Sequence, residues 1–297
     1  MISKKALIGY PAGFLTGVTY GLNPLFAMPL LAAGAAVQNV LFFRYAIATI
    51  LLGLFIALSS AKGMTFRVSF RQLCLLITLG VLFTFSSLLL FMAYSYIPSG
   101  LATTLVFLYP AMVAVIMAFL GKMPSWPVWA SVGATFIGVA IMTGAGTGQT
   151  LDITGILLSV GSALAYSFFI VIINRSRAIA GVSNTVLTFY ALLTGCLIFF
   201  IMALRDDAAL TAGISGLSAW CNLVGLAVFP TIVSTATLAV ATRNIGATKA
   251  SVMGVFEPIT AIIVGAMVLG ESLTTPVIAG ITISVAAVVM MIRLTGR

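Results

Sequence analysis

The chain has 297 residues, of which 62% are hydrophobic and only 6% are charged. Soluble domains carry about 25% charged residues, so this composition excludes water as the main solvent and predicts a polytopic membrane protein. The sequence contains no histidine, no pair of carboxylates within an apolar span and no Cys/His cluster. Acid–base and metal-dependent catalysis are therefore disfavoured, and we predict neither enzyme activity nor a cofactor.

Ten apolar spans follow one another along the chain, each near the ~20 residues that a helix needs to cross about 30 Å of hydrocarbon. The runs are apolar all round rather than alternating, which favours helices over a β-barrel. The loops between them are too short to form a soluble domain with its own core. The predicted spans are 6–27, 37–59, 70–93, 99–120, 126–144, 154–174, 184–204, 217–240, 248–269 and 275–293.

Basic residues are distributed unequally between the two sides that these spans define. With the N-terminus placed in the cytoplasm, twelve basic residues fall on the inner side and only Arg205 on the outer side. The positive-inside rule therefore predicts that both termini are cytoplasmic. Because topology accounts for the net charge of +9, no nucleic-acid partner is predicted.

The two halves of the chain share one pattern. A shift of 148 residues places 93–110 over 241–258, so that Pro110 meets Pro258. Because each half holds five spans, an odd number, the second half must insert upside down. We therefore predict an all-α membrane protein of ten helices, built as two inverted-topology five-helix repeats, 1–146 and 147–297, with a binding site between them at mid-membrane.

The matching prolines suggest where the repeats bend. Proline removes a backbone donor and loosens a helix, so Pro110 and Pro258 are candidate hinges. The alternative is that both residues only kink packed helices, which is common in membrane proteins.

Two charged residues lie inside the predicted spans, Arg44 in the second and Glu257 in the ninth. A charge in hydrocarbon is costly, so both side chains are expected to face a cavity or a partner. Arg44 is predicted to bind a carboxylate or another acidic group of a ligand, although it could instead extend to the outer headgroups. Glu257 either takes up and releases a proton during transport or acts as a fixed counter-ion beside Pro258.

Polar side chains at a similar depth complete the predicted substrate site. Tyrosine combines a flat apolar face with one hydroxyl, which suits an organic molecule of mixed polarity. Ser87 and Thr231 lie at the same depth. The other predicted substrate-binding residues are Tyr20, Asn23, Ser86, Tyr109, Tyr166, Tyr190, Ser234 and Thr235.

Residues 235–251, followed by Glu257-Pro258 and Leu269-Gly270-Glu271, resemble the EamA-type branch of the drug/metabolite transporter superfamily. The first-half counterpart, 93–110, is similar to the same module, so the resemblance covers essentially the whole chain. It implies a ten-helix carrier in a bacterial cytoplasmic (inner) membrane, often an exporter of amino acids, related metabolites or foreign compounds. It also carries over Glu257 and Pro258 as the Glu-Pro pair of the family.

The leading prediction is a secondary transporter that exports a small amino acid-like or drug-like metabolite by alternating access. Its partners are the substrate, membrane lipid and, in one version, protons, and the protein acts as a monomer or homodimer. One alternative is an importer or exchanger of an organic anion such as a nucleotide sugar, although a single intramembrane arginine is little cation for two phosphates. Another is a sensor or scaffold that does not transport.

Overall fold

The computed structural model describes residues 4–59, 65–121, parts of 126–141, 152–179, 181–205, 209–245 and 253–295. Within these residues the secondary structure is helical and contains no strand, in agreement with the predicted all-α class. The fifth predicted span, 126–144, lies mostly outside the described residues. Seven of the described helical segments are long and apolar enough to cross a membrane, and α13 and part of α14 are shorter apolar helices.

The helices follow the predicted order along the chain. The first half contains α1 (Lys4–Gly21), α2 (Asn23–Ala32), α3 (Val37–Leu58), α4 (Phe70–Ala93), α5 (Ser99–Val106) and α6 (Tyr109–Phe119). The second half contains α8 (Ile153–Arg175), η2 (Arg177–Ile179), α9 (Asn184–Leu204), α10 (Gly216–Ala227), η3 (Val228–Val233), α11 (Ser234–Ile245), α13 (Phe256–Met267) and α14 (Thr275–Thr295).

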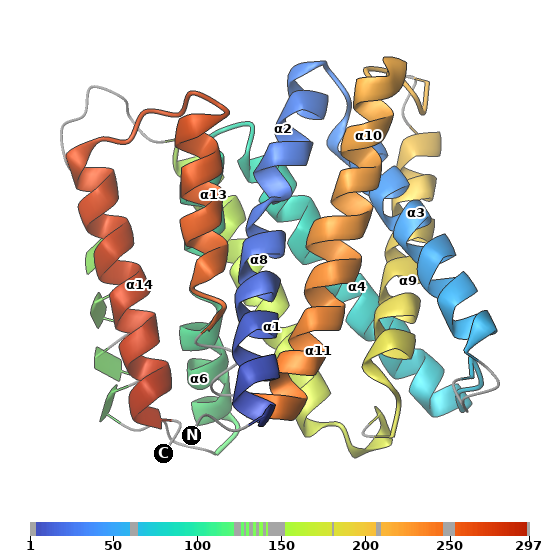
Figure 1. Ribbon diagram of the computed structural model, residues 1–297, viewed down its shortest axis with the longest axis horizontal. Coiled ribbons are helices and arrows are strands. Elements are labelled where there is room, and N and C mark those ends of the chain that lie inside the picture. The colour runs from blue at the N-terminus through green and yellow to red at the C-terminus, as the bar shows by residue number, and fades with distance from the viewer. Residues whose placement is uncertain are drawn as a thin grey trace.

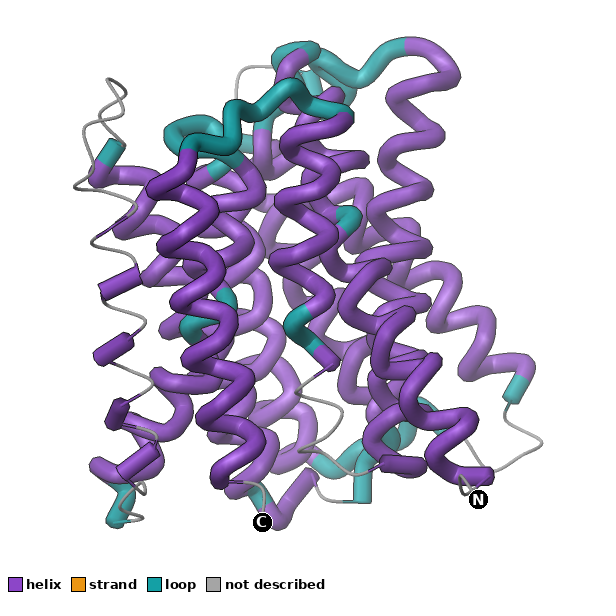
Figure 2. Tube along the Cα trace, turned by 60° about the vertical axis from the view of Figure 1, so that its left-hand side comes forward, coloured by secondary structure: helices purple, strands orange, loops and turns teal. Residues whose placement is uncertain are grey.

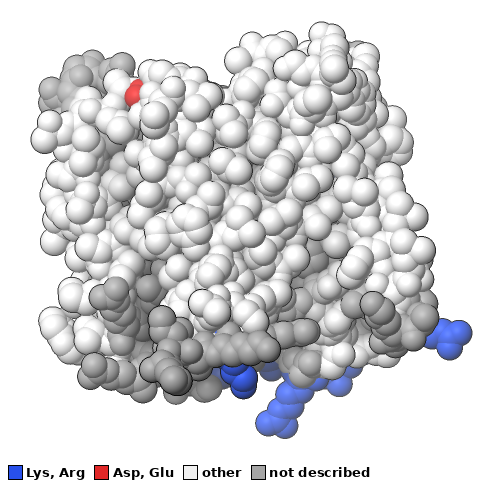
Figure 3. Space-filling view, in the orientation of Figure 1, with Lys and Arg blue, Asp and Glu red and all other residues white. Residues whose placement is uncertain are grey.

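The helices stand upright beside one another, and both ends of the chain lie at the same end of the bundle (Figure 1). In Figure 2 the connecting loops gather at the two ends of the bundle, and short interruptions lie partway along some helices. On the face drawn in Figure 3, lysine and arginine side chains gather at the end that holds the termini, and an acidic side chain lies near the opposite end. The wall between is uncharged, as a lipid-facing surface requires.

Two helical segments differ from their predicted spans. The first continues to Ala32 instead of ending at residue 27, because Pro24 occupies the first turn of α2, where its missing N–H costs nothing. The eighth, predicted as one helix over 217–240, contains the π-helical segment η3 between α10 and α11. A π turn has the composition of any apolar helix, so hydrophobicity alone does not reveal it.

One row of residues along α1 consists of glycines that lie close to neighbouring segments. A Cβ atom built on Gly17 would lie 2.8 Å from the carbonyl oxygen of Met253 and 2.8 Å from the Cβ of Phe256. One built on Gly21 would lie 2.5 Å from the carbonyl oxygen of Glu257. Backbone approach this close needs small residues, and here it brings α1 against the start of α13. The glycines of this face recur every four residues, at Gly9, Gly13, Gly17 and Gly21.

The carboxylate of Glu271 joins the two halves of the chain. Glu271 lies between α13 and α14 and accepts hydrogen bonds from the backbone N–H of Ser99 at 2.7 Å and of Gly100 at 3.2 Å. The hydroxyl of Ser99 donates to the same carboxylate. The first N–H groups of a helix have no partner within it, so an anion there both satisfies them and interacts with the helix dipole. Glu271 therefore caps α5 from the other half of the chain.

Replacing Glu271 with alanine should lower the free energy of unfolding by about 2 kcal/mol, because hydrogen bonds to a charged group contribute about 1.5–3 kcal/mol. Unfolding of the purified protein in one detergent measures this loss. The control is Asp152→Ala, since Asp152 caps α8 from an exposed position with a hydrogen bond from Thr154 N–H at 2.7 Å. Equal losses in the two variants would contradict the proposed role of Glu271 as a link between the halves.

Candidate functional site

Three predicted site residues stand where a helix begins inside the bundle. Helix α2 begins after a turn at Leu22, α6 begins after a turn at residues 107–108, and α13 begins after a turn at residues 254–255. In each case a polar residue is followed by a proline within the first turn of the helix, where proline is tolerated. The pairs are Asn23 and Pro24, Tyr109 and Pro110, and Glu257 and Pro258. The interruptions predicted beside Pro110 and Pro258 are thus present, whereas their use as hinges remains a prediction.

Glu257 lies among three tyrosines. Tyr20, Tyr109 and Tyr166 are all within electrostatic reach of its carboxylate. The rings of Tyr109 and Tyr166 meet edge to face with centroids 5.0 Å apart. All four side chains are half-buried. The group therefore brings one carboxylate and three tyrosine side chains together inside the bundle.

Arg44 is enclosed by protein rather than extended to a headgroup. Its side chain is 2% exposed, and its Nε–H donates to the hydroxyl of Thr231 at 2.9 Å. The guanidinium carbon lies 5.5 Å from the ring centroid of Phe91 and 5.9 Å from that of Tyr45, within the range of cation–π attraction. Among the described residues no acidic side chain pairs with it. Arg44 is therefore a buried cation without a described counter-ion.

Arg44 and Glu257 lie within electrostatic reach of the same tyrosines, but they do not form an ion pair with each other. Tyr20 is within electrostatic reach of both charged groups, and so is Tyr94. Asn23 lies at the start of α2 and donates from its amide to the carbonyl oxygen of Tyr20 at 2.9 Å. The amide oxygen of Asn23 is buried and has no partner among the described residues. It is thus a further acceptor close to Tyr20.

Three other predicted site residues, Ser86, Ser234 and Tyr190, form hydrogen bonds to protein groups. The hydroxyl of Ser86 lies 3.1 Å from that of Ser162, which joins α4 to α8. Ser234 donates to the carbonyl oxygen of Pro230 in its own helix at 2.7 Å. Tyr190 donates to the carbonyl oxygen of Phe66 at 2.7 Å and packs in a separate apolar cluster with α4 and η2. The three hydroxyls thus bond to protein groups in the structure, and their contact with a substrate stays a prediction.

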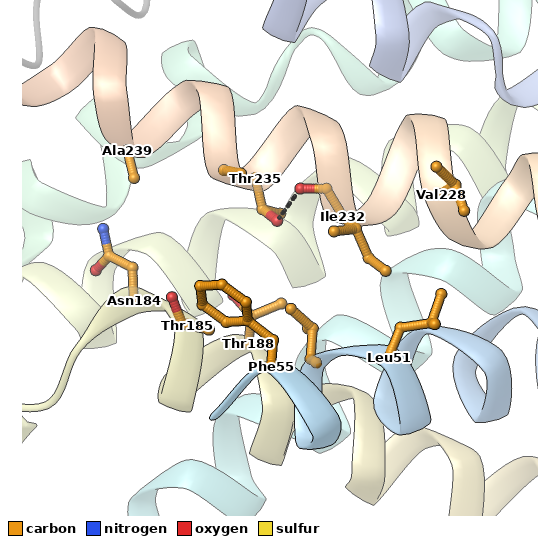
Figure 4. Close-up of a pocket in the computed structure, with 11 residues that line it drawn as sticks. Leu51, Phe55, Asn184, Thr185, Thr188, Val228, Ile232, Thr235 and Ala239 are labelled. Atoms are coloured by element: carbon orange, nitrogen blue, oxygen red, sulfur yellow. Dashed lines mark hydrogen bonds between the residues drawn. The ribbon is translucent and has the colours of Figure 1, made fainter. Parts of the chain in front are cut away.

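A cavity of about 380 Å³ lies between α3, α9 and the segment formed by η3 and α11 (Figure 4). Thr235 is the predicted site residue that lines it, and Thr185 and Thr188 contribute further hydroxyls from α9. Most of the remaining lining is apolar, including Leu51 and Phe55 of α3. The sequence analysis did not identify this cavity, because its lining comes from three segments that only tertiary packing brings together.

Comparison with known proteins places these features in a wider context. A family model described as the EamA-like transporter family matches residues 7–144 and again 153–293. The chain is 23% identical to the uncharacterized transporter YvbV of Bacillus subtilis over 205 aligned residues. The alignment covers 66% of this chain and 64% of YvbV. It is 27% identical to the uncharacterized transporter sll1319 of Synechocystis sp. over 202 aligned residues. This alignment covers 65% of this chain and 58% of sll1319.

The chain thus spans less than two thirds of the length of each of these two relatives. Among solved structures, one crystal structure, titled only as that of a protein, superposes with a TM-score of 0.64. The superposition covers 97% of this chain and 96% of the other at 17% sequence identity, which shows a shared fold.

Proposed function

Because the chain belongs to the EamA-like transporter family, we propose that it is a secondary transporter of a small organic metabolite that binds between Arg44 and Glu257. The observation that carries the proposal is the pair of opposite charges, neither with a described ion-pair partner, within electrostatic reach of the same residue, Tyr20. Charges kept inside a membrane protein usually serve a substrate or ion pathway.

The chemistry of this group supports a substrate class. A guanidinium suits a carboxylate or another acidic group, and the carboxylate of Glu257 suits an amine. The rings of Tyr20, Tyr109 and Tyr166 provide apolar faces for the body of the molecule. An amino acid-like or drug-like compound has these features. A nucleotide sugar fits less well, because its two phosphates would face Glu257 as well as a single arginine.

The helix packing supports alternating access between two inverted repeats, 1–146 and 147–297. In this scheme α3 corresponds to α9, and the span formed by α5 and α6 corresponds to the span that contains α13. Helix α3 contacts α9, and α5 contacts α13. The contact of α1 with α11 has its counterpart in the contact of α8 with α4. The double match of the family model agrees with the same division. We propose that Pro110 and Pro258 allow the half-helices they begin to tilt during the cycle.

The cavity supports a direction of transport. It is lined by the C-terminal part of α3 and the N-terminal part of α9, which lie toward the end of the bundle that holds the two chain termini (Figure 1). We assign that end to the cytoplasm by the positive-inside rule. We propose that the substrate enters there and is exported across a bacterial inner membrane.

Counterflow in proteoliposomes tests the proposal. Vesicles loaded with an unlabelled amino acid mixture should accumulate ¹⁴C-labelled amino acids, with labelled benzoate and ethidium as tests of an anionic and a drug-like substrate. Arg44→Lys keeps the charge but loses the planar fork, so KM should rise about tenfold. Arg175→Ala, which changes an exposed arginine, is the matched control and should transport normally. Accumulation of all three probes no faster than in protein-free liposomes would contradict the proposed function.

A further inference from the structure

The π-helical segment η3 contains a local cause for the position of Arg44. Pro230 has no N–H, so it cannot donate to the carbonyl oxygen of Leu226 four residues earlier. The hydroxyl of Thr231 donates to that carbonyl oxygen instead, at 2.9 Å. A side chain thus takes over a backbone acceptor that proline leaves without its usual donor.

This bond decides how Thr231 meets Arg44. A threonine hydroxyl has one hydrogen and two lone pairs, and its hydrogen is used on Leu226. The hydroxyl can then only accept from other groups, and it accepts from the Nε–H of Arg44 at 2.9 Å. Arginine can only donate, so what the bond to Leu226 fixes is the orientation of the hydroxyl that accepts from Arg44.

The guanidinium is restrained from two directions. Its Nε–H is held by Thr231, and the rings of Phe91 and Tyr45 lie 5.5 and 5.9 Å from its central carbon. A guanidinium can bind a carboxylate through the edge that includes Nε or through the two terminal nitrogens. Because Nε is occupied, the pair of terminal nitrogens is the edge left for a ligand.

We propose that Thr231 is a positioning residue for Arg44, and that it selects the edge formed by the two terminal nitrogens for the acidic group of the substrate. The proposal rests on the transport function proposed above. The arrangement is confined to the second half of the chain, since the shift of 148 residues places Leu82 opposite Pro230. Helix α4, which contains Leu82, is a regular α-helix from Phe70 to Ala93.

Side-chain NMR of the full chain in nanodiscs, with ¹⁵N-labelled arginine, tests the positioning without a substrate. The sequence has nine arginines, and the Nε–H signal that disappears in Arg44→Lys belongs to Arg44. In Thr231→Val this signal should exchange with water about tenfold faster, because the acceptor is lost. Thr231→Ser keeps the hydroxyl and should restore slow exchange. Thr104→Val should change nothing, because the buried hydroxyl of Thr104 bonds to the carbonyl oxygen of Gly100 and, among the described residues, to no other group.

Pro230→Ala is a second variant that leaves both bonded side chains in place. Alanine restores an N–H that can donate to Leu226, so the hydroxyl of Thr231 is no longer held in the orientation that accepts from Arg44, and the Nε–H of Arg44 should again exchange faster. This variant keeps the test decisive if Thr231→Val does not fold. Slow exchange of the Arg44 signal in every folded variant of Thr231 and Pro230 would overturn the proposal.

Counterflow of ¹⁴C-labelled amino acids separates this inference from the function on which it rests. Thr231→Val should raise KM about tenfold with a smaller change in maximal rate, and Thr231→Ser should restore KM. In an Arg44→Lys background, Thr231→Val should add no further effect, because both changes remove the same contact. If the wild-type protein shows no counterflow, the proposed function is contradicted. If the wild type transports and Thr231→Val has an unchanged KM, the positioning role is contradicted.

Discussion

Replacing Glu257 with glutamine should abolish accumulation driven by a pH gradient while leaving counterflow measurable. The amide has nearly the same shape as the carboxyl group but cannot take up and release a proton. Glu257 lies in the first turn of α13 and is half-buried. A carboxylate in this position is suited to exchange a proton with substrate or water during the cycle.

The measurement compares accumulation of ¹⁴C-labelled amino acids in proteoliposomes with and without an imposed pH gradient. The control is Asp152→Asn, which makes the same chemical change at an exposed helix cap and should retain gradient-driven transport. If Glu257 is a fixed counter-ion, Glu257→Gln should instead weaken both modes in parallel. A variant that responds to the gradient as the wild type does would rule out proton coupling through this residue.

Replacing Gly17 with alanine should destabilise the protein by about 3 kcal/mol, toward the upper end of the cost of overpacking. The new methyl group would lie 2.8 Å from the carbonyl oxygen of Met253 and 3.2 Å from the backbone nitrogen of Glu257. These are backbone atoms, so neither can rotate away, and α1 must move from α13. Because this displacement also moves Tyr20 relative to Glu257, transport should fall together with stability.

The same substitution at Gly161, in α8, is the matched control. There the new Cβ meets only the terminal Cδ1 of Leu89 at 3.1 Å, the flexible end of a side chain. Both changes carry the same gain in helix propensity of about 1 kcal/mol, so the difference between them isolates the steric effect. Unfolding in a single detergent measures both. Equal stability of Gly17→Ala and Gly161→Ala would show that α1 does not rely on its glycine face.

The helical interruptions show how far local sequence leads. Pro110 and Pro258 predicted local breaks, and α6 and α13 begin within two residues of them. Pro230 is also a proline inside a predicted span, but the span 217–240 was predicted as one uninterrupted helix, so the π-helical segment was missed. The spacing of Gly9, Gly13, Gly17 and Gly21 was also visible in the sequence. Its meaning required knowledge of which helix lies against that face.

Within the candidate site, the sequence singles out most clearly the residues that are costly in lipid. Arg44 and Glu257 stand out because an ionised group inside an apolar span needs a specific reason to be there. Hydroxyl residues carry no such cost, since a serine or tyrosine can bond to its own or a neighbouring helix. Depth alone therefore grouped Ser86 and Tyr190 with Tyr20, whereas the structure bonds them to Ser162 and Phe66.

By itself the sequence determined that this chain is a helical membrane protein and which charges its spans contain. The reason is that backbone hydrogen bonds in hydrocarbon must be satisfied within each segment, so span and helix are set locally. Only the tertiary structure decided that Tyr20 lies within reach of both charges and that Thr231 holds Arg44. Those relations depend on how close α1, α3, η3 and α13 approach one another, and that closeness is set by side-chain shapes on several helices at once.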